Sequence, residues 1–485
     1  MTLDAVERHA VWWREDAEAR APADPCPALQ GERRVDVCVV GGGFTGLWTA
    51  IEVTEAAPGA RVALVEAREC GYGASGRNGG WATGWHDELD GLVERFGEAE
   101  GLRLAARSAW AIDRIESFTR DHVIDCDFRR AGALWTATAP WQLGAWDGAV
   151  ATCQRLGRGK YLEVLDPADL RARTGSAYFL AGARQTDAAS LQPALLVAGL
   201  RRVALELGVE LFESTPVTGL ARSRPAVVST PRGRVVADAV VLATGAWIAS
   251  IPELRRAVIP VGSHLVATEP VAERFGDAGC ANGELLGDAR LMVHYAQVTP
   301  AGRVVFGRGG GALGPAGRVL ARHFENPAVV ASVAADLARM LPAVAGARLT
   351  HGWGGPVDRA PGHLPFVGRL PGDGAVFFGA GFSGNGVAPS ALVGRILGRL
   401  AVGLRDDDTE SSLAQGPPNY WPPEPLRSAG GVAVRALVAA AEDERHPWRS
   451  RRAHRALRRL VATSVPAALD PRARRAAQSR RRPAP

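Results

Sequence analysis

One stretch, VDVCVVGGGFTGLWTAIEV at residues 35–53, constrains the fold more than any other part of the chain. Its apolar run Val35–Val40 is typical of a parallel strand that is buried on both faces. Gly41, Gly43 and Gly46 follow at G-x-G-x-x-G spacing, which permits a tight turn, a close approach of phosphate to the backbone, and packing of a helix on the strand. The stretch therefore predicts a strand, a turn and a helix whose N-terminus faces phosphate groups.

A second apolar strand is predicted at Arg61–Val65, and it ends at Glu66, 20 residues after Gly46. A carboxylate at this place accepts hydrogen bonds from the ribose hydroxyls of adenosine. Residues 35–66 therefore predict a unit that holds the ADP half of a dinucleotide. This unit alone does not separate NAD from FAD.

The segment Ala67–Trp81, ARECGYGASGRNGGW, follows the acidic residue directly. Because it is rich in glycine and small polar residues, its backbone can run close to a planar ligand and donate N–H groups to it. A flexible surface loop is the alternative interpretation. Trp81 and Trp85 argue against that alternative, since tryptophan is uncommon in exposed loops.

Four segments together resemble a known family. GYGASGRNGG at 71–80 is close to a signature of the D-amino-acid-oxidase-like superfamily of FAD-dependent oxidoreductases, and most similar to its gamma-glutamylputrescine oxidoreductase branch. Pro216–Val217, VVLATGAW at 240–247 and FFGAGFSGNGVAPSALVGRILGRL at 377–400 match the same superfamily. The resemblance implies an FAD enzyme that removes a hydride from a carbon bearing an amine. The imine product is hydrolysed, and O2 reoxidises the flavin to give H2O2.

The motifs and the resemblance together predict the residues that hold FAD. They are Gly41, Gly43, Phe44, Thr45, Gly46, Glu66, Ala67, Ser75, Gly76, Arg77, Asn78, Gly79, Gly80, Trp81, Val217, Thr244, Gly245, Trp247, Gly381, Phe382, Ser383, Gly384, Asn385, Gly386 and Val387.

The last of these segments also has a physical interpretation without the family. Gly381–Gly386 is a glycine-rich turn that enters a helix with Pro389 in its first turn. Such a helix would aim its positive end at the N1/C2=O edge of a flavin, where the reduced form is negative. A simple helix cap is the alternative. A serine nucleophile elbow is excluded, because Asn385 occupies the last glycine position of G-x-S-x-G.

The order of the patterns predicts an α/β fold in which a Rossmann-like FAD-binding domain with a parallel sheet is discontinuous in sequence. We expect this domain at 31–86, 185–250 and 350–403, after an N-terminal helix and lead-in at 1–30. A second, mixed or antiparallel substrate domain is expected at 87–184 and 251–349, and a Pro-rich, then Arg-rich and partly disordered tail at 404–485.

Catalytic candidates come from the predicted strands of the second domain. Relatives carry aromatic residues of the substrate site near His294 and Tyr295, and His264 is a further candidate. Many relatives have a carboxylate-clamping arginine near the position of Gln297. Either this chain does not bind an α-carboxylate there, or Arg308 provides the clamp.

Several features restrict the cofactor chemistry. No cysteine follows Cys280, and Arg359 and Asn78 occupy the positions at which some relatives attach FAD covalently, so we expect non-covalent FAD. Some of these oxidases use a lysine near the flavin to speed the reaction with O2, but Lys160 is the only lysine here. A flavin dehydrogenase that passes electrons to another acceptor therefore remains an alternative, as does a non-catalytic nucleotide-binding protein.

Composition indicates the class of protein and its cellular compartment. The chain is 47% hydrophobic and 22% charged, which is typical of a globular protein, and it has no apolar run long enough for a membrane span. Six scattered cysteines predict neither disulfides nor a metal site and favour the cytoplasm. The segment from Arg445 to the end holds 13 arginines and one acidic residue. We expect a solvated tail without specific nucleic-acid binding, and a small amine as the substrate.

Overall fold

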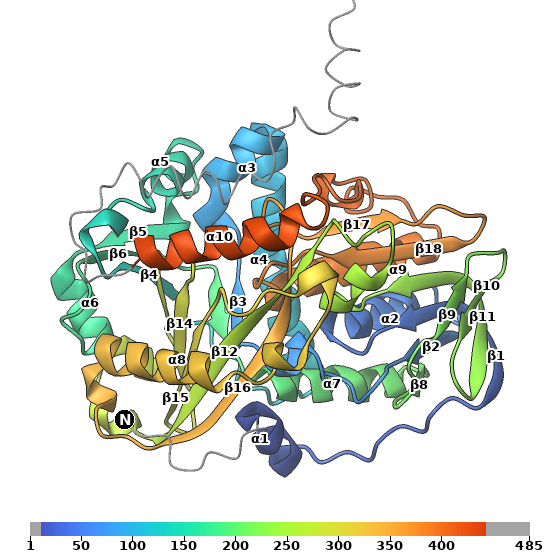
Figure 1. The fold of residues 1–485 in the computed structure, drawn as a ribbon, viewed down its shortest axis with the longest axis horizontal. Helices are drawn as coiled ribbons and strands as arrows, with labels where there is room; N and C mark the ends of the chain where they lie inside the picture. The colour runs from blue at the N-terminus through green and yellow to red at the C-terminus, as the bar shows by residue number, and fades with distance from the viewer. Residues whose placement is uncertain (1–10, 443–485) are drawn as a thin grey trace, which may run out of the picture.

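The computed structural model describes residues 11–442, which are organised around two large sheets (Figure 1). The first sheet has the order β17-β18-β11-β1-β2-β8, and β10 and β9 are attached beside β11. Its strands are β1 (Gly31–Val40), β2 (Val62–Val65), β8 (Glu210–Phe212), β9 (Gly219–Ala221), β10 (Ala226–Ser229), β11 (Gly233–Leu242), β17 (Phe366–Arg369) and β18 (Ala375–Ala380). From β18 to β8 the strands run parallel, so their carboxyl ends meet at one edge of the sheet.

The second sheet has the order β16-β12-β15-β14-β13-β4-β6-β5. Its strands are β4 (Ala133–Ala137), β5 (Leu162–Leu165), β6 (Ala181–Gln185), β12 (Ile259–Pro270), β13 (Leu285–Asp288), β14 (His294–Val298), β15 (Arg303–Arg308) and β16 (Leu349–Arg359). Its neighbours pair antiparallel except β4 and β13, which pair parallel. Between the sheets, the short strands β3 (Trp81–Thr83) and β7 (Ala188–Ser190) pair with each other.

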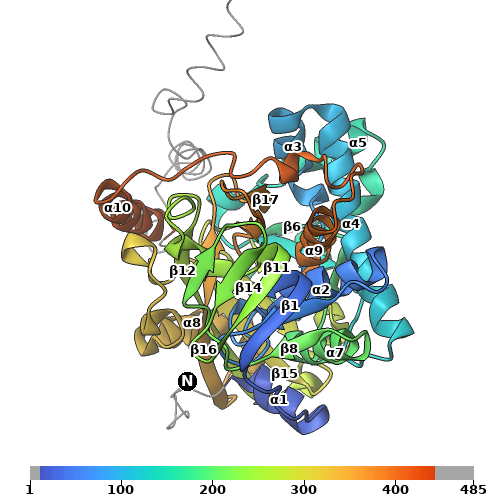
Figure 2. The same cartoon turned by 90° about the vertical axis from the view of Figure 1, so that its right-hand side faces the viewer.

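Helices cover both sheets (Figure 2). Helix α2 packs between α7 and α9 beside the first sheet, and α8 packs on β12, β15 and β16 of the second. The helices are α1 (Trp12–Arg20), α2 (Phe44–Ala56), α3 (Leu89–Phe96), α4 (Glu98–Asp121), α5 (Asp147–Arg155), α6 (Pro167–Thr174), α7 (Pro193–Glu206), α8 (Pro327–Met340), α9 (Val387–Ala401) and α10 (Leu426–Ala441). None of the helices within residues 11–442 is long and apolar enough to cross a bilayer.

The predicted α/β fold with a parallel, discontinuous sheet and a second mixed sheet is confirmed. One strand differs from the predicted ranges: β16 pairs with β12 in the second sheet along almost its whole length, although 350–403 was expected in the FAD-binding domain. Helices α3 and α4 are separated by the single residue Gly97, whose φ of 82° breaks the helical conformation.

The segment expected as a tail begins with an ordered part. Its residues 426–441 form helix α10, which crosses the outside of the second domain (Figure 1). The arginine-rich residues from Arg445 onward lie outside the described part of the chain.

Candidate active site

Three of the predicted cofactor segments leave adjacent parallel strands. Val40 of β1 is in register with Leu242 of β11, which is in register with Phe378 of β18. The turns at 41–46, 243–247 and 381–386 therefore emerge side by side at the carboxyl edge of the first sheet. Ligands of open α/β sheets bind at this edge.

The first turn is closed too tightly for any side chain. Gly41 has φ 112°, and a Cβ there would lie 2.5 Å from the carbonyl oxygen of Ala243. A Cβ on Gly46 would lie 1.8 Å from the carbonyl oxygen of Gly41. Helix α2 begins after Gly43 without a side-chain cap from that residue, so its N-terminal N–H groups face the turn. These are the requirements of a phosphate cradle.

Glu66 connects this cradle to the strand that follows. Its carboxylate accepts the N–H of Gly42 at 2.7 Å and that of Arg68 at 2.9 Å, while burial raises its pKa. Its carbonyl accepts the N–H of Thr215 at 2.7 Å, which brings the segment containing Val217 beside it. Glu66, predicted to bind the ribose, and Val217, predicted to contact the adenine, thus belong to neighbouring segments.

The segment 71–80 lies against the start of α2. Ser75 Oγ accepts the N–H of Phe44 at 2.9 Å. The Asn78 side chain closes the turn, since it donates to the Ser75 carbonyl at 2.9 Å and accepts the N–H of Gly80 at 2.7 Å. The segment therefore has a fixed backbone path rather than that of a free loop.

Arg77 anchors the same segment inside the protein. Its Nε donates to the carbonyl of Tyr72 at 2.8 Å, its guanidinium lies 5.0 Å from the centre of the Phe324 ring, and burial lowers its pKa to about 10. Trp353 of β16 donates its indole N–H to the Arg77 carbonyl at 2.9 Å. Arg77 thus joins the cofactor segment to the second sheet. Nearby, the ring of Trp247 covers Gly73, where a Cβ would lie 3.2 Å from it.

The third turn is held by Asp358 of β16 and by Ala360, just after that strand. Asp358 accepts the N–H of Gly381 at 2.6 Å, and Ser383 Oγ accepts the N–H of Ala360 at 3.1 Å. Helix α9 then begins after Gly386, again without a side-chain cap. Sequence reasoning missed Asp358, because nothing in DRAP ties an aspartate to a turn more than 20 residues later.

The geometry fits a dinucleotide with an isoalloxazine ring. Two helices point N-termini without an N-cap side chain at the same sheet edge, where Ser75 Oγ occupies only the first N–H of α2, and Gly41 and Gly46 leave room for close backbone contacts there. Within the described residues, Asn385 Oδ1 is buried and has no hydrogen-bond partner. A buried amide oxygen without a donor is costly, so this atom is suited to a ligand.

The four catalytic candidates do not come together. Tyr295 faces the cofactor segment: its ring occupies the space beside Gly79, lies 6.2 Å from the Trp81 ring, and its hydroxyl is 2.7 Å from Ser263 Oγ. Gln297, on the same face of β14, donates to the Gly79 carbonyl at 2.6 Å. Gln297 therefore positions the cofactor segment.

His294 and Arg308 lie on the opposite face, under α8. His294 is buried with Nδ1 2.7 Å from Asp288 and Nε2 3.0 Å from Asp336. Arg308 donates to Asp336 and to Ser332, each at 3.0 Å. Burial lowers the pKa of His294, but the two carboxylates outweigh it and raise that pKa overall. These contacts describe an ion-pair network within the protein.

His264 is also on the α8 side. Its ring is completely buried among Gly262, Gly311 and Gly354, and a Cβ on any of these glycines would lie 3.0 Å or less from the ring. Burial lowers the pKa of His264 to about 4, so the ring is neutral. The packing accounts for the three glycines.

A polar group near the third turn was not predicted as a substrate site. Arg359, at the end of β16, places Nη2 2.7 Å from Nε2 of His363, and burial lowers the pKa of Arg359 to about 10 while Glu88 raises it. Glu88 keeps exposed surface, yet surrounding protein raises its pKa. Arg359 in turn lowers the pKa of Glu88, so the two charged groups lie near each other. Glu88 follows β3, and Arg359 lies between the residues that bind Gly381 and Ser383, so both adjoin cofactor segments.

Comparisons with known proteins agree with this geometry. The profile of the family described as FAD-dependent oxidoreductase matches residues 36–400. The chain is 28% identical to gamma-glutamylputrescine oxidoreductase of Escherichia coli K12, over 86% of this chain and 93% of that protein. It is 27% identical to glycine oxidase of Geobacillus kaustophilus, over 76% of this chain and 93% of that protein. The crystal structure of glycine oxidase from Geobacillus kaustophilus superposes with a TM-score of 0.63 at 21% identity, covering 77% and 96% of the two chains.

Proposed function

Because the chain belongs to the family of FAD-dependent oxidoreductases, we propose that it oxidises a carbon–nitrogen bond of a small amine or amino acid. Bound FAD supplies the hydride acceptor. The imine product is released to water, which hydrolyses it to a carbonyl, and O2 is the final electron acceptor. The similarity to proteins named for gamma-glutamylputrescine and for glycine supports an amine as the donor.

The observation that carries this proposal is the meeting of the glycine-rich sheet edge with one face of the second sheet. The uncapped starts of α2 and α9 hold the cofactor, and Tyr295 and Trp81 lie where the second sheet meets that edge. The aromatic rings exclude water and hold the substrate carbon in place. No side-chain base is required, because a neutral amine releases hydride directly.

The experiment is an anaerobic screen of polyamines, secondary amines and amino acids, with flavin absorbance as the signal. We expect at least one amine to bleach the visible flavin band, and admission of air to restore it with release of H2O2. Bleaching without peroxide would favour a dehydrogenase that uses another acceptor. If no amine bleaches the flavin, the proposal fails and a non-catalytic nucleotide-binding protein becomes the better interpretation.

Within this function, Arg359 and Glu88 favour a substrate that carries a carboxylate as well as an amine. The guanidinium of Arg359 is contacted by the neutral ring of His363, whose pKa falls to about 3 beside this cation and through burial. Glu88 is close enough to raise the pKa of Arg359, but within residues 11–442 no carboxylate forms an ion pair with it, so its guanidinium is suited to a substrate carboxylate. Arg359→Gln should lower kcat/KM for a carboxylated amine about 10- to 100-fold, the loss of one charge-assisted contact. The same amine without its carboxylate should be affected less than threefold, and Arg232→Gln, an exposed arginine, serves as the control. Equal effects on both amines would exclude this role.

We also expect the FAD to be held without a covalent bond. All six cysteines are free, and Arg359 and Asn78, which stand where relatives attach FAD through a cysteine and a histidine respectively, offer neither a thiol nor an imidazole. Acid precipitation should therefore leave the yellow colour in the supernatant. Colour in the protein pellet would contradict this.

A further inference from the structure

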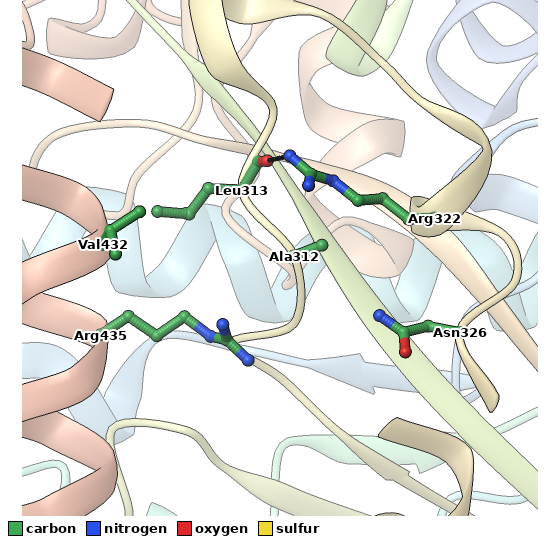
Figure 3. Close-up of a pocket in the computed structure, with 6 residues that line it drawn as sticks. All are labelled: Ala312, Leu313, Arg322, Asn326, Val432 and Arg435. Carbon is green, nitrogen blue, oxygen red and sulfur yellow. Dashed lines mark hydrogen bonds between the residues drawn. The ribbon is translucent and has the colours of Figure 1, made fainter. Parts of the chain in front are cut away.

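A pocket of about 250 Å³ lies between α10 and two loop segments that follow β15 (Figure 3). Two neighbouring loop segments and helix α10, which lies more than 100 residues later in the sequence, line it. They contribute Ala312 and Leu313, Arg322 and Asn326, and Val432 and Arg435. The pocket exists because α10 lies across these loops.

Several contacts hold α10 in this position. Glu424, just before the helix, accepts the N–H of Ala316 at 3.1 Å, and Glu442, just after it, accepts the N–H of Leu291 at 2.6 Å. In the middle, Gly431 allows close approach, since a Cβ there would lie 2.8 Å from Leu313 Cδ1. The pocket is therefore bounded by a helix fixed at both ends.

Two guanidinium groups face this space without acidic partners. Arg322 donates to the Leu313 carbonyl at 2.8 Å, and Arg435 donates to the Gly310 carbonyl at 2.9 Å. Neither forms an ion pair with any residue between 11 and 442. Each carbonyl contact orients its guanidinium and leaves further N–H donors available.

Asn326 adds a neutral donor. Its Oδ1 accepts the N–H of Val329 at 3.3 Å as the cap of α8, so the side-chain NH2 group is directed away from the helix. Figure 3 shows Arg322, Asn326 and Arg435 reaching into the space from different sides. Burial lowers the pKa of His264, and the nearby Arg308 and Arg435 lower it further.

We propose that this pocket binds a small anion through a carboxylate or phosphate group placed between Arg322 and Arg435. Planar guanidinium groups bind such oxyanions with paired hydrogen bonds. Leu313 and Val432 provide an apolar wall against which a short carbon chain can lie. The bound anion joins α10 to the body of the second domain.

Isothermal titration calorimetry of the full-length holoenzyme tests this with inorganic phosphate in one arm and succinate in the other. NaCl at matched ionic strength controls for screening. We expect saturable binding of at least one of the two anions, and about tenfold weaker binding or more in both Arg322→Gln and Arg435→Gln. Arg232→Gln should bind like the wild type. Retention of the flavin spectrum confirms that each variant is folded.

The two arms and one further variant identify the site. If succinate binding is lost in Arg359→Gln but kept in Arg435→Gln, succinate binds at the proposed substrate site around Arg359, and the pocket proposal is overturned. Absence of saturable binding above the NaCl control, or unchanged affinity in both pocket variants, would also overturn it. None of these outcomes bears on whether an amine bleaches the flavin, so the proposed function is tested separately.

Discussion

Replacing His294 by glutamine separates a structural from a catalytic role for this predicted residue. The imidazole contacts Asp288 through Nδ1 and Asp336 through Nε2, and the single amide nitrogen of a glutamine cannot occupy both of these positions. Removing one partner of a buried ion pair costs about 3–5 kcal/mol. Arg290 still contacts Asp288 at 2.9 Å and Arg308 still contacts Asp336 at 3.0 Å, so we expect the lower end, about 3 kcal/mol. That is a large part of a typical stability of about 5–15 kcal/mol.

The loss should depend on pH. The pKa of His294 is raised in the folded protein, so its contribution is complete below the unfolded value of 6.5 and disappears as pH rises through the folded value. The difference in unfolding free energy between wild type and His294→Gln should therefore shrink as pH rises above 6.5. Urea titrations followed by far-UV circular dichroism at several pH values measure it.

Flavin reduction by an amine, measured per bound flavin, provides the contrast. We expect His294→Gln to change this rate less than threefold, because its side chain lies under α8. Tyr295→Ala is the matched control. Tyr295 is the next residue on β14 and its ring lies against Gly79, so we expect the rate of flavin reduction to fall at least about tenfold. A large fall in the rate for His294→Gln with unchanged stability would refute this reasoning and restore His294 as a catalytic candidate.

Two further outcomes follow from the cradle and from the single lysine. Gly46→Ala should abolish retention of FAD through gel filtration, because its Cβ would lie 1.8 Å from the Gly41 carbonyl oxygen. Gly91→Ala tests whether any loss is specific, because Gly91 is exposed on helix α3 and a Cβ there meets no atom within 4 Å. Lys160→Met should leave the rate of flavin reoxidation by O2 unchanged in stopped flow, because this exposed ammonium lies over the Tyr161 ring; a severalfold slower reoxidation would show that it reaches the oxygen site.

The nucleotide end of the molecule was predictable because its constraints are local. Gly41, Gly43 and Gly46 lie in one turn; Gly46 is required by the backbone of Gly41, and Gly41 by the backbone of Ala243 directly after the neighbouring strand. The position of Glu66 was predictable because it directly follows the second apolar strand. The position of β16 was not predictable in the same way, since its pairing with β12 joins segments about 90 residues apart. Asp358 and Arg359 acquire their places from that pairing.

Which catalytic candidate faces the cofactor depends on which side of the sheet each residue of β14 points to, and the sequence does not show this. His294 and Tyr295 are neighbours on a strand, so they face opposite sides of the sheet. In a sheet with one wet face, alternating polarity would reveal which residue points inward. Here α8 covers one face of the second sheet and the cofactor segment adjoins the other, so both residues are enclosed and alternation is lost. The choice is made by partners remote in sequence, Asp336 on α8 for His294 and Gly79 for Tyr295. The packing of α8 on one face of the sheet therefore decides which residue of β14 faces the cofactor segment, and the order of residues along β14 alone does not specify this.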